Sequence, residues 1–96
     1  MDLKEIILKA VKNINEELNI EELQNVNDET PLFELLDSLG TLDLILELES
    51  SLEDATGNYI AVASEESMDA KNTPFKTIVT LEKFLEQRIA DESDQF

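Results

Sequence analysis

The chain has 96 residues, with 23 acidic and 7 basic side chains that leave a net charge of −16 at pH 7. This length suits one domain and is too short for two, so we expect residues 1–96 to fold as a single domain. So negative a field disfavours nucleic acids and anionic membranes as partners and favours proteins with basic patches. Cysteine and histidine are absent, which excludes disulfides, Ser-His-Asp or Cys-His nucleophilic sites, and zinc sites of the Cys/His kind.

Hydrophobic residues make up 42% of the chain, whereas glycine and proline number 2 each, which favours helices over an all-β fold rich in tight turns. The first five residues do not resemble a signal peptide, and no apolar run reaches membrane-spanning length. We therefore expect a helical protein of the cytoplasm, without direct membrane insertion, and a monomer by default.

The first predicted helix covers residues 2–18, because apolar side chains recur there at steps of three and four with charged residues on the other face. Residues 19–36 are expected to form a long loop, since asparagines interrupt the periodicity and Pro31 prevents a continuous helix. A single helical turn can form around residues 21–24. The apolar side chains of this loop are expected to pin it over the core.

The second long helix is predicted to begin at Asp37-Ser38, where Asp or Ser can accept a hydrogen bond from an otherwise unpaired amide. It runs to about Asp54, and Gly57-Asn58 ends it. At about 100° per residue, one broad apolar arc is expected to face the core: Leu39, Leu42, Ile45, Leu46, Leu48 and Leu52.

Other side chains of this helix fall outside that arrangement. Asp43, Glu47 and Asp54 lie on the side opposite the apolar arc. Leu44 lies at the edge of the arc, and we expect it to be partly exposed. Glu49 lies inside the arc, and its long side chain is expected to reach for solvent.

Residues 55–72 are predicted to be a connector, with an apolar stretch over 59–63 that is buried rather than paired as a strand, and a short helix over 65–70. The last helix is predicted to begin at Thr73-Pro74, since Thr is a capping residue and Pro fits a first helical position. Residues 91–96 read as a frayed polar tail. The whole predicts an all-α bundle of three main helices plus short pieces.

One motif points to a function. Leu36-Asp37-Ser38-Leu39-Gly40-Thr41 opens the second helix, and a Leu-rich acidic stretch over 42–49 follows it. This pattern resembles the attachment site of acyl carrier proteins. The Gly-Thr after the Asp-Ser-Leu triplet, together with Asn72-Thr73-Pro74, is most similar to the D-alanyl carrier proteins of teichoic-acid D-alanylation.

The resemblance implies an acyl-carrier-protein-like bundle of three to four helices, with a long loop between the first two long helices. It implies that Ser38 bears a 4′-phosphopantetheine arm whose thiol holds an acyl or aminoacyl group, D-alanine first among them, as a thioester. The chain would be a carrier without catalytic turnover or a metal site. A phosphopantetheinyl transferase, an acyl- or D-alanine-activating ligase and a downstream acyltransferase would be its partners, and their docking residues would be Asp37, Leu39, Asp43, Leu44 and Glu47.

Plainer interpretations stay open at this point. Ser38 can be a simple N-cap, and Asp43 and Glu47 can belong to a solvated helix face. The cargo can be that of a fatty-acid or polyketide-type carrier, and the chain can instead be an unmodified acidic adaptor for a basic partner. A calcium loop over 54–65 is a weak alternative, because its sixth position is Tyr59 where glycine is needed.

Overall fold

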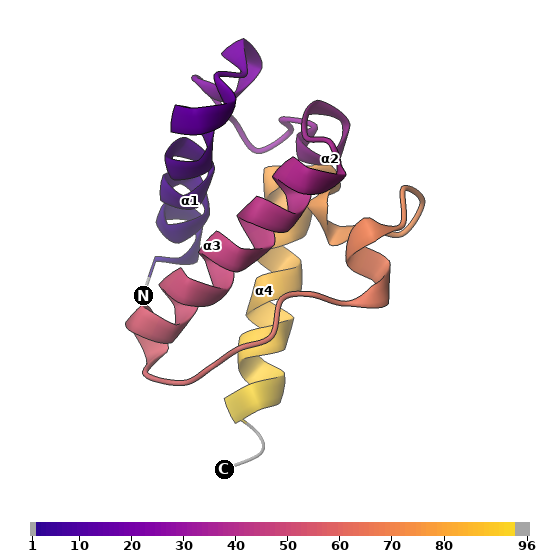
Figure 1. The fold of residues 1–96 in the computed structure, drawn as a ribbon. Helices are drawn as coiled ribbons and strands as arrows, with labels where there is room; N and C mark the ends of the chain where they lie inside the picture. Colours follow the sequence, from indigo (N-terminus) through magenta and orange to yellow (C-terminus); the bar gives the residue numbers. More distant parts are fainter. Residues whose placement is uncertain (1, 94–96) are drawn as a thin grey trace.

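The computed structural model describes residues 2–93 of the chain. It is built from four α-helices and three short 3₁₀ turns: α1 (Leu3–Leu18), η1 (Glu21–Leu23), α2 (Leu32–Leu35), α3 (Ser38–Thr56), η2 (Glu65–Met68), η3 (Pro74–Lys76) and α4 (Ile78–Ser93). α1 runs opposite to α3 and α4, and the three long helices surround one core (Figure 1). Residues 2–93 contain no strand, so the predicted all-α bundle with a long loop before its second long helix is confirmed.

The bounds of α1 follow from its caps. The Asp2 carboxylate accepts a hydrogen bond from the amide of Glu5 at 3.1 Å, and Asn19 ends the helix in the left-handed conformation with φ 55°. Asn15 then ties down the exit: its side chain donates to the Ile20 carbonyl at 3.0 Å and accepts from the Ile20 amide at 2.8 Å. The predicted helix over 2–18 is therefore confirmed.

The connection from α1 to α3 is more ordered than the predicted loop. It contains η1, at the place of the predicted helical turn, and the four-residue helix α2, which the sequence pattern did not predict. Pro31 stands directly before α2, where a proline does not interrupt helical hydrogen bonds. Leu32 and Leu36 are buried, as expected of apolar anchors, and fix this corner on the core.

α3 begins and ends where its capping residues predict. The Asp37 carboxylate accepts from the amide of Gly40 at 2.7 Å, and Gly57 ends the helix with φ 78°, a conformation that favours glycine. The helix extends two residues beyond the predicted end at Asp54, as the Thr56 hydroxyl bonds the Leu52 carbonyl at 2.8 Å.

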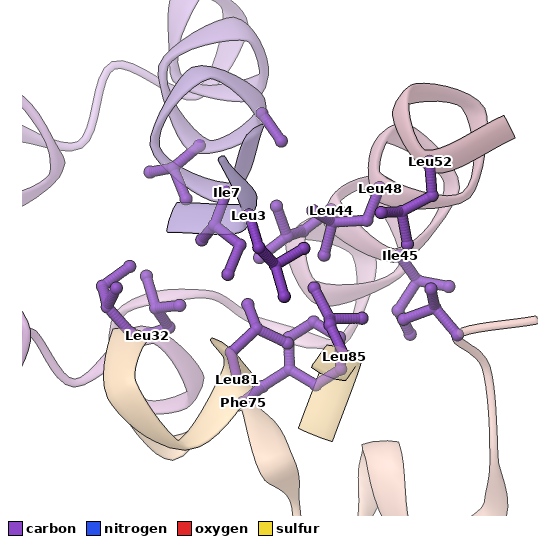
Figure 2. Close-up of a cluster of buried hydrophobic side chains, with 14 of the residues drawn as sticks. Leu3, Ile7, Leu32, Leu44, Ile45, Leu48, Leu52, Phe75, Leu81 and Leu85 are labelled. Carbon is purple, nitrogen blue, oxygen red and sulfur yellow. The ribbon is translucent and has the colours of Figure 1, made fainter. Parts of the chain in front are cut away.

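The prediction of which α3 side chains face the core is wrong for several leucines. Leu44 is 0% exposed and lies inside the core, with Leu48 beyond it (Figure 2). Leu42 and Leu46, which were expected in the core, are 45% and 57% exposed, and Leu39 is 66% exposed. α3 is apolar around more than half of its circumference, so its own sequence does not decide which leucines meet α1 and α4.

The last helix starts later than predicted. Thr73 caps the separate turn η3 by accepting from the amide of Phe75 at 3.1 Å. Thr77 is then extended, and α4 starts at Ile78, with the Thr80 amide donating to the Thr77 hydroxyl at 3.2 Å. α4 runs through Ser93, so residues 91–93 of the predicted tail are helical, and residues 94–96 lie outside the described residues.

The core holds aliphatic side chains from all four α-helices and one aromatic ring, Phe75, which is 0% exposed (Figure 2). Ile60 and Val62 of the connector are also buried, whereas Tyr59, directly before them, is 59% exposed. The predicted buried connector is thus buried at alternate positions. Each fully buried Leu or Ile contributes about 1.5–3 kcal/mol of transfer free energy.

Candidate functional site

Ser38 occupies the corner where α2 gives way to α3. The backbone is extended at Leu36 and Asp37 and becomes helical at Ser38. Leu36 packs against Gly40, where an added Cβ would lie 3.2 Å from Leu36 Cδ2. The absence of a side chain at Gly40 therefore lets the corner close tightly, which leaves Ser38 at its tip.

The Ser38 side chain is exposed, and its hydroxyl has no hydrogen-bond partner within residues 2–93. Asp37, and not Ser38, is the N-cap, so the interpretation of Ser38 as a simple cap is wrong. The hydroxyl is free to react with an external group. An exposed serine that does not cap the helix is suited to be a covalent attachment point.

The start of α3 is only partly open to an anion. The first amides of a helix lack intrahelical acceptors, and a helix N-terminus carries a partial positive charge. However, the Asp37 carboxylate already accepts a hydrogen bond from the Gly40 amide, and its negative charge would repel a phosphate bound at the start of α3. The residues present thus fit a phosphate held by a covalent bond to Ser38 better than one held by the helix end alone.

An apolar groove of about 490 Å³ opens directly beside Ser38. One wall belongs to α3 and the other to the connector and η2. Apart from the hydroxyls of two serines, the lining is carbon-rich, and its members are Ser38, Leu39, Leu42, Ile45, Ala63, Ser64 and Met68. The groove can take the apolar part of a chain attached to Ser38 or an apolar side chain of a partner.

The exposed leucines of α3 form a stripe that begins next to Ser38. Leu39, Leu42 and Leu46 share this side of the helix, and Met68 of η2 is also exposed, at 43%. Contiguous exposed apolar surface beside a reactive group is typical of an interaction site. Leu44 takes no part in it, because it is buried, so its predicted role in docking is wrong.

The acidic residues lie on the α1 side of α3. Asp43 and Glu47 border a shallow hollow of about 220 Å³ together with Glu17 of α1, and Asn13 of α1 donates to Glu47 at 3.0 Å. Glu47 is nine residues beyond Ser38, which places it about 14 Å away along the helix axis. Asp43 and Glu47 thus line a different hollow from the groove, which Leu39 and Leu42 of the leucine stripe line.

Sequence reasoning missed several residues of this site. Nothing in the local pattern marked Ala63, Ser64 and Met68 as neighbours of Ser38, since they come from the segment with the weakest periodicity. Glu17 was also missed, because only the packing of α1 on α3 brings it to Asp43. The run of leucines over 39–46 was the available signal for a surface stripe, since more leucines occur there than one buried face can hold.

Two other expectations concern metals and membranes. Asp54 and Thr56 lie in the last turn of α3, and Glu65 opens η2. Within residues 2–93, no three or more acidic side chains gather closely enough to hold a metal ion, so the calcium alternative gains no support. Of the helices that the structure describes, none is long and apolar enough to cross a membrane.

The fold and the site together define a class of protein. An all-helical bundle whose longest helix opens on an exposed, unpaired serine, flanked by acidic and apolar side chains, is of the acyl-carrier-protein type.

Comparison with known proteins narrows this class. The chain is 42% identical over 80 residues to the D-alanyl carrier protein of Streptococcus suis (strain 05ZYH33), a match that covers 81% of this chain and 89% of that protein. The chain therefore belongs to the D-alanyl carrier protein family. Neither a protein-family model nor a solved structure matches it.

Proposed function

We propose that this protein is a single-domain carrier, over residues 1–96, for the D-alanine of teichoic-acid D-alanylation, and that Ser38 is its attachment point. The observation that carries the proposal is the exposed Ser38 hydroxyl, which has no partner within residues 2–93, in a chain 42% identical to a D-alanyl carrier protein. In this proposal the Ser38 oxygen would attack the pantetheine-side phosphorus of coenzyme A. The phosphoanhydride bond breaks, a phosphodiester to 4′-phosphopantetheine forms, 3′,5′-adenosine bisphosphate leaves, and the serine proton passes to a base of the transferase. When bound, the arm supplies the thiol that holds the aminoacyl group as a thioester.

The chain itself does no acid–base chemistry in this proposal. Histidine is absent and the neighbouring Asp37 carboxylate caps α3, so the proposal assigns the deprotonation of Ser38 to a separate phosphopantetheinyl transferase. A ligase then activates D-alanine, and a downstream acyltransferase removes it. The proposal places the first two steps in the cytoplasm, where coenzyme A and ATP are available.

The test of attachment is the intact mass after incubation with coenzyme A and a promiscuous phosphopantetheinyl transferase. We expect one pantetheine adduct on the wild-type chain and none on Ser38→Ala. Ser50→Ala, which removes another exposed serine of α3, is the matched control and should be modified like wild type. An unmodified wild-type chain would leave the acidic adaptor as the better hypothesis.

The test of cargo uses the modified protein. A D-alanine ligase should charge it with D-alanine, and the thioester should be lost on treatment with hydroxylamine. Malonyl and fatty-acyl donors with their own transferases serve as the comparison, because a fatty-acid or polyketide-type carrier is the alternative within this class. Charging by malonyl donors alone would overturn the D-alanyl assignment.

We further propose that partners dock over the leucine stripe and its acidic rim. Leu39 and Leu42 supply apolar contact beside Ser38, and Asp37, Asp43 and Glu47 face basic side chains. Rim charges mainly change association rates, so Asp43→Lys should raise the KM of the transferase for the carrier most strongly at low salt. The same KM at every salt concentration would contradict this docking surface.

A further inference from the structure

The connector wall of the groove is held by an unusual means. Residues 59–64 have no regular secondary structure, and no strand lies beside them within residues 2–93. The connector crosses α4 on its way to η2 (Figure 1). Backbone amides and carbonyls that pack on a protein surface need partners. Here side chains of the two long helices provide them.

Glu49 of α3 accepts three hydrogen bonds from this segment. Its Oε2 accepts from the amides of Val62 at 2.8 Å and Ala63 at 3.2 Å, and its Oε1 accepts from the Tyr59 hydroxyl at 3.2 Å. Bonds to a carboxylate are stronger than neutral ones. The expectation that Glu49 simply reaches solvent is therefore wrong: the carboxylate is the anchor of the connector on α3.

Arg88 of α4 also binds the connector. Its Nε donates to the Ala61 carbonyl at 3.0 Å, and the Val62 carbonyl accepts from the buried Ser67 hydroxyl at 3.3 Å. Consecutive peptide units from Ala61 to Ala63 are thus fixed by side chains rather than by a backbone ladder. We call this set of contacts, made by Glu49, Arg88 and Ser67 to residues 59–63, the clasp.

The clasp is directly connected to the groove beside Ser38. Glu49 lies one helical turn beyond Ile45, on the same side of α3, and Ile45 lines the groove. Ala63, whose amide Glu49 binds, lines the opposite wall, and Ser64 follows it. The length of the Glu49 side chain therefore sets the spacing between the two walls.

We infer that Glu49 is a positioning residue of the carrier site: by holding the connector against α3, it fixes the groove that an enzyme acting at Ser38 must recognise. This inference rests on the proposed attachment at Ser38. A surface that is already ordered costs less entropy to bind than one that must be ordered on binding. Glu49 differs in this from Glu53 of the next turn, whose exposed carboxylate makes no hydrogen bond or ion pair within residues 2–93.

The experiment compares wild type, Glu49→Ala, Glu49→Gln and Glu53→Ala as substrates of a phosphopantetheinyl transferase, below the melting temperature of every variant. Glu49→Ala should raise the KM for the carrier by about tenfold with kcat changed less than about twofold. Glu49→Gln keeps one acceptor oxygen and should fall between. Glu53→Ala removes the same charge from the same helix and should stay within about twofold of wild type.

A second readout does not depend on Ser38. Tyr59 is the single tyrosine and tryptophan is absent, so tyrosinate absorbance reports on this contact alone. The charge of Glu49 raises the pKa of Tyr59 above its ordinary value, with smaller effects from desolvation, the hydrogen bond from Tyr59 to Glu49, and Glu53. Glu49→Gln should therefore lower the pKa of Tyr59, and Glu53→Ala should lower it less.

The outcomes separate the possible failures. Equal KM values for Glu49→Ala and Glu53→Ala would overturn the positioning role, as would a loss of stability with unchanged KM, which marks a merely structural contact. An unchanged Tyr59 titration in Glu49→Gln would show that the clasp does not form in solution. If Glu49→Ala does not fold, Glu49→Gln decides by itself. A wild-type chain that no transferase modifies overturns the proposed function, whatever Tyr59 shows.

Discussion

The two long connections of the bundle, residues 19–37 and 57–73, are ordered by different means. The first forms short helical turns whose own backbone closes them, as when the amide of Leu36 bonds the Leu32 carbonyl at 2.9 Å. The second has no regular secondary structure over 59–64 and depends there on side chains of α3 and α4. The first is held mainly by contacts within itself and by burial, although the Val79 amide of α4 also donates to the Asp28 carbonyl at 3.0 Å, while the second depends on side chains far away in sequence.

The largest loss of stability should come from truncating a buried side chain of the first connection. Leu32 is 0% exposed at the start of α2, and Leu32→Ala should lower the free energy of unfolding by about 2–5 kcal/mol, because it leaves a cavity in the core. Urea denaturation measures this change, with Glu34→Ala on the exposed side of α2 as control. A loss below 1 kcal/mol would mean that α2 is not packed on the core in solution.

A smaller loss should follow from removing a polar contact in the second connection. The buried Thr73 hydroxyl donates to the Ser67 carbonyl at 2.8 Å and accepts from the Phe75 amide at 3.1 Å. Thr73→Val keeps the shape but leaves both backbone groups without a partner, so we expect a loss of about 1–3 kcal/mol in urea denaturation.

The control for this change is Thr80→Val. The Thr80 hydroxyl also bonds a backbone carbonyl, that of Pro74 at 2.8 Å, but Thr80 is exposed and water can replace it. Its loss should therefore stay below about 1 kcal/mol. If Thr73→Val and Thr80→Val lose equal free energy of unfolding, then water can replace the buried side-chain hydrogen bonds of the second connection. That result would contradict the described role of Thr73.

A substitution within α3 should stabilise the protein. Thr41 is 0% exposed, and its hydroxyl has no hydrogen-bond partner within the described part of the chain. Thr41→Val replaces this hydroxyl with a methyl group of similar size, so it should raise the free energy of unfolding by about 1 kcal/mol. Thermal and urea denaturation both measure it. A destabilised variant would show that the hydroxyl is bonded in solution, which would remove the contrast between Thr41 and the satisfied Thr73.

The smallest effect concerns pH at the turn that closes the second connection. The amide of Lys71 and then the side chain of Asn72 donate to the Asp69 carboxylate, which lowers its pKa below the ordinary 3.8. Because the pKa of Asp69 is lower in the folded state, its hydrogen bonds stabilise the fold fully at a pH above its ordinary pKa. This stabilisation is lost as the pH falls through the pKa of the folded state. An NMR titration of Asp69 should give a midpoint below 3.8, and Asp69→Asn should weaken the pH dependence of stability in that window. A midpoint at or above the ordinary value would contradict the turn as described.

The candidate site was predictable in part. Asp37-Ser38 at the head of α3 follows from local chemistry, since a capping carboxylate and a helix start are encoded within four residues. The surroundings of Ser38 were not predictable in the same way. Ala63, Ser64 and Glu17 reach the site through contacts between segments distant in sequence, which no local pattern records.

The sequence by itself determined the ends of α1 and the corner at Ser38, because caps, periodicity and the left-handed conformations at Asn19 and Gly57 act within a few residues. Only the tertiary structure decided that Leu44 is buried while Leu42 and Leu46 face solvent. The reason is that α3 is apolar on more than one face, so its rotation is set by the side chains of α1 and α4 that pack on it. The hydrogen-bond partners of Glu49 were also decided by the tertiary structure, because the amides of Val62 and Ala63 reach its carboxylate only when the connector folds back onto α3.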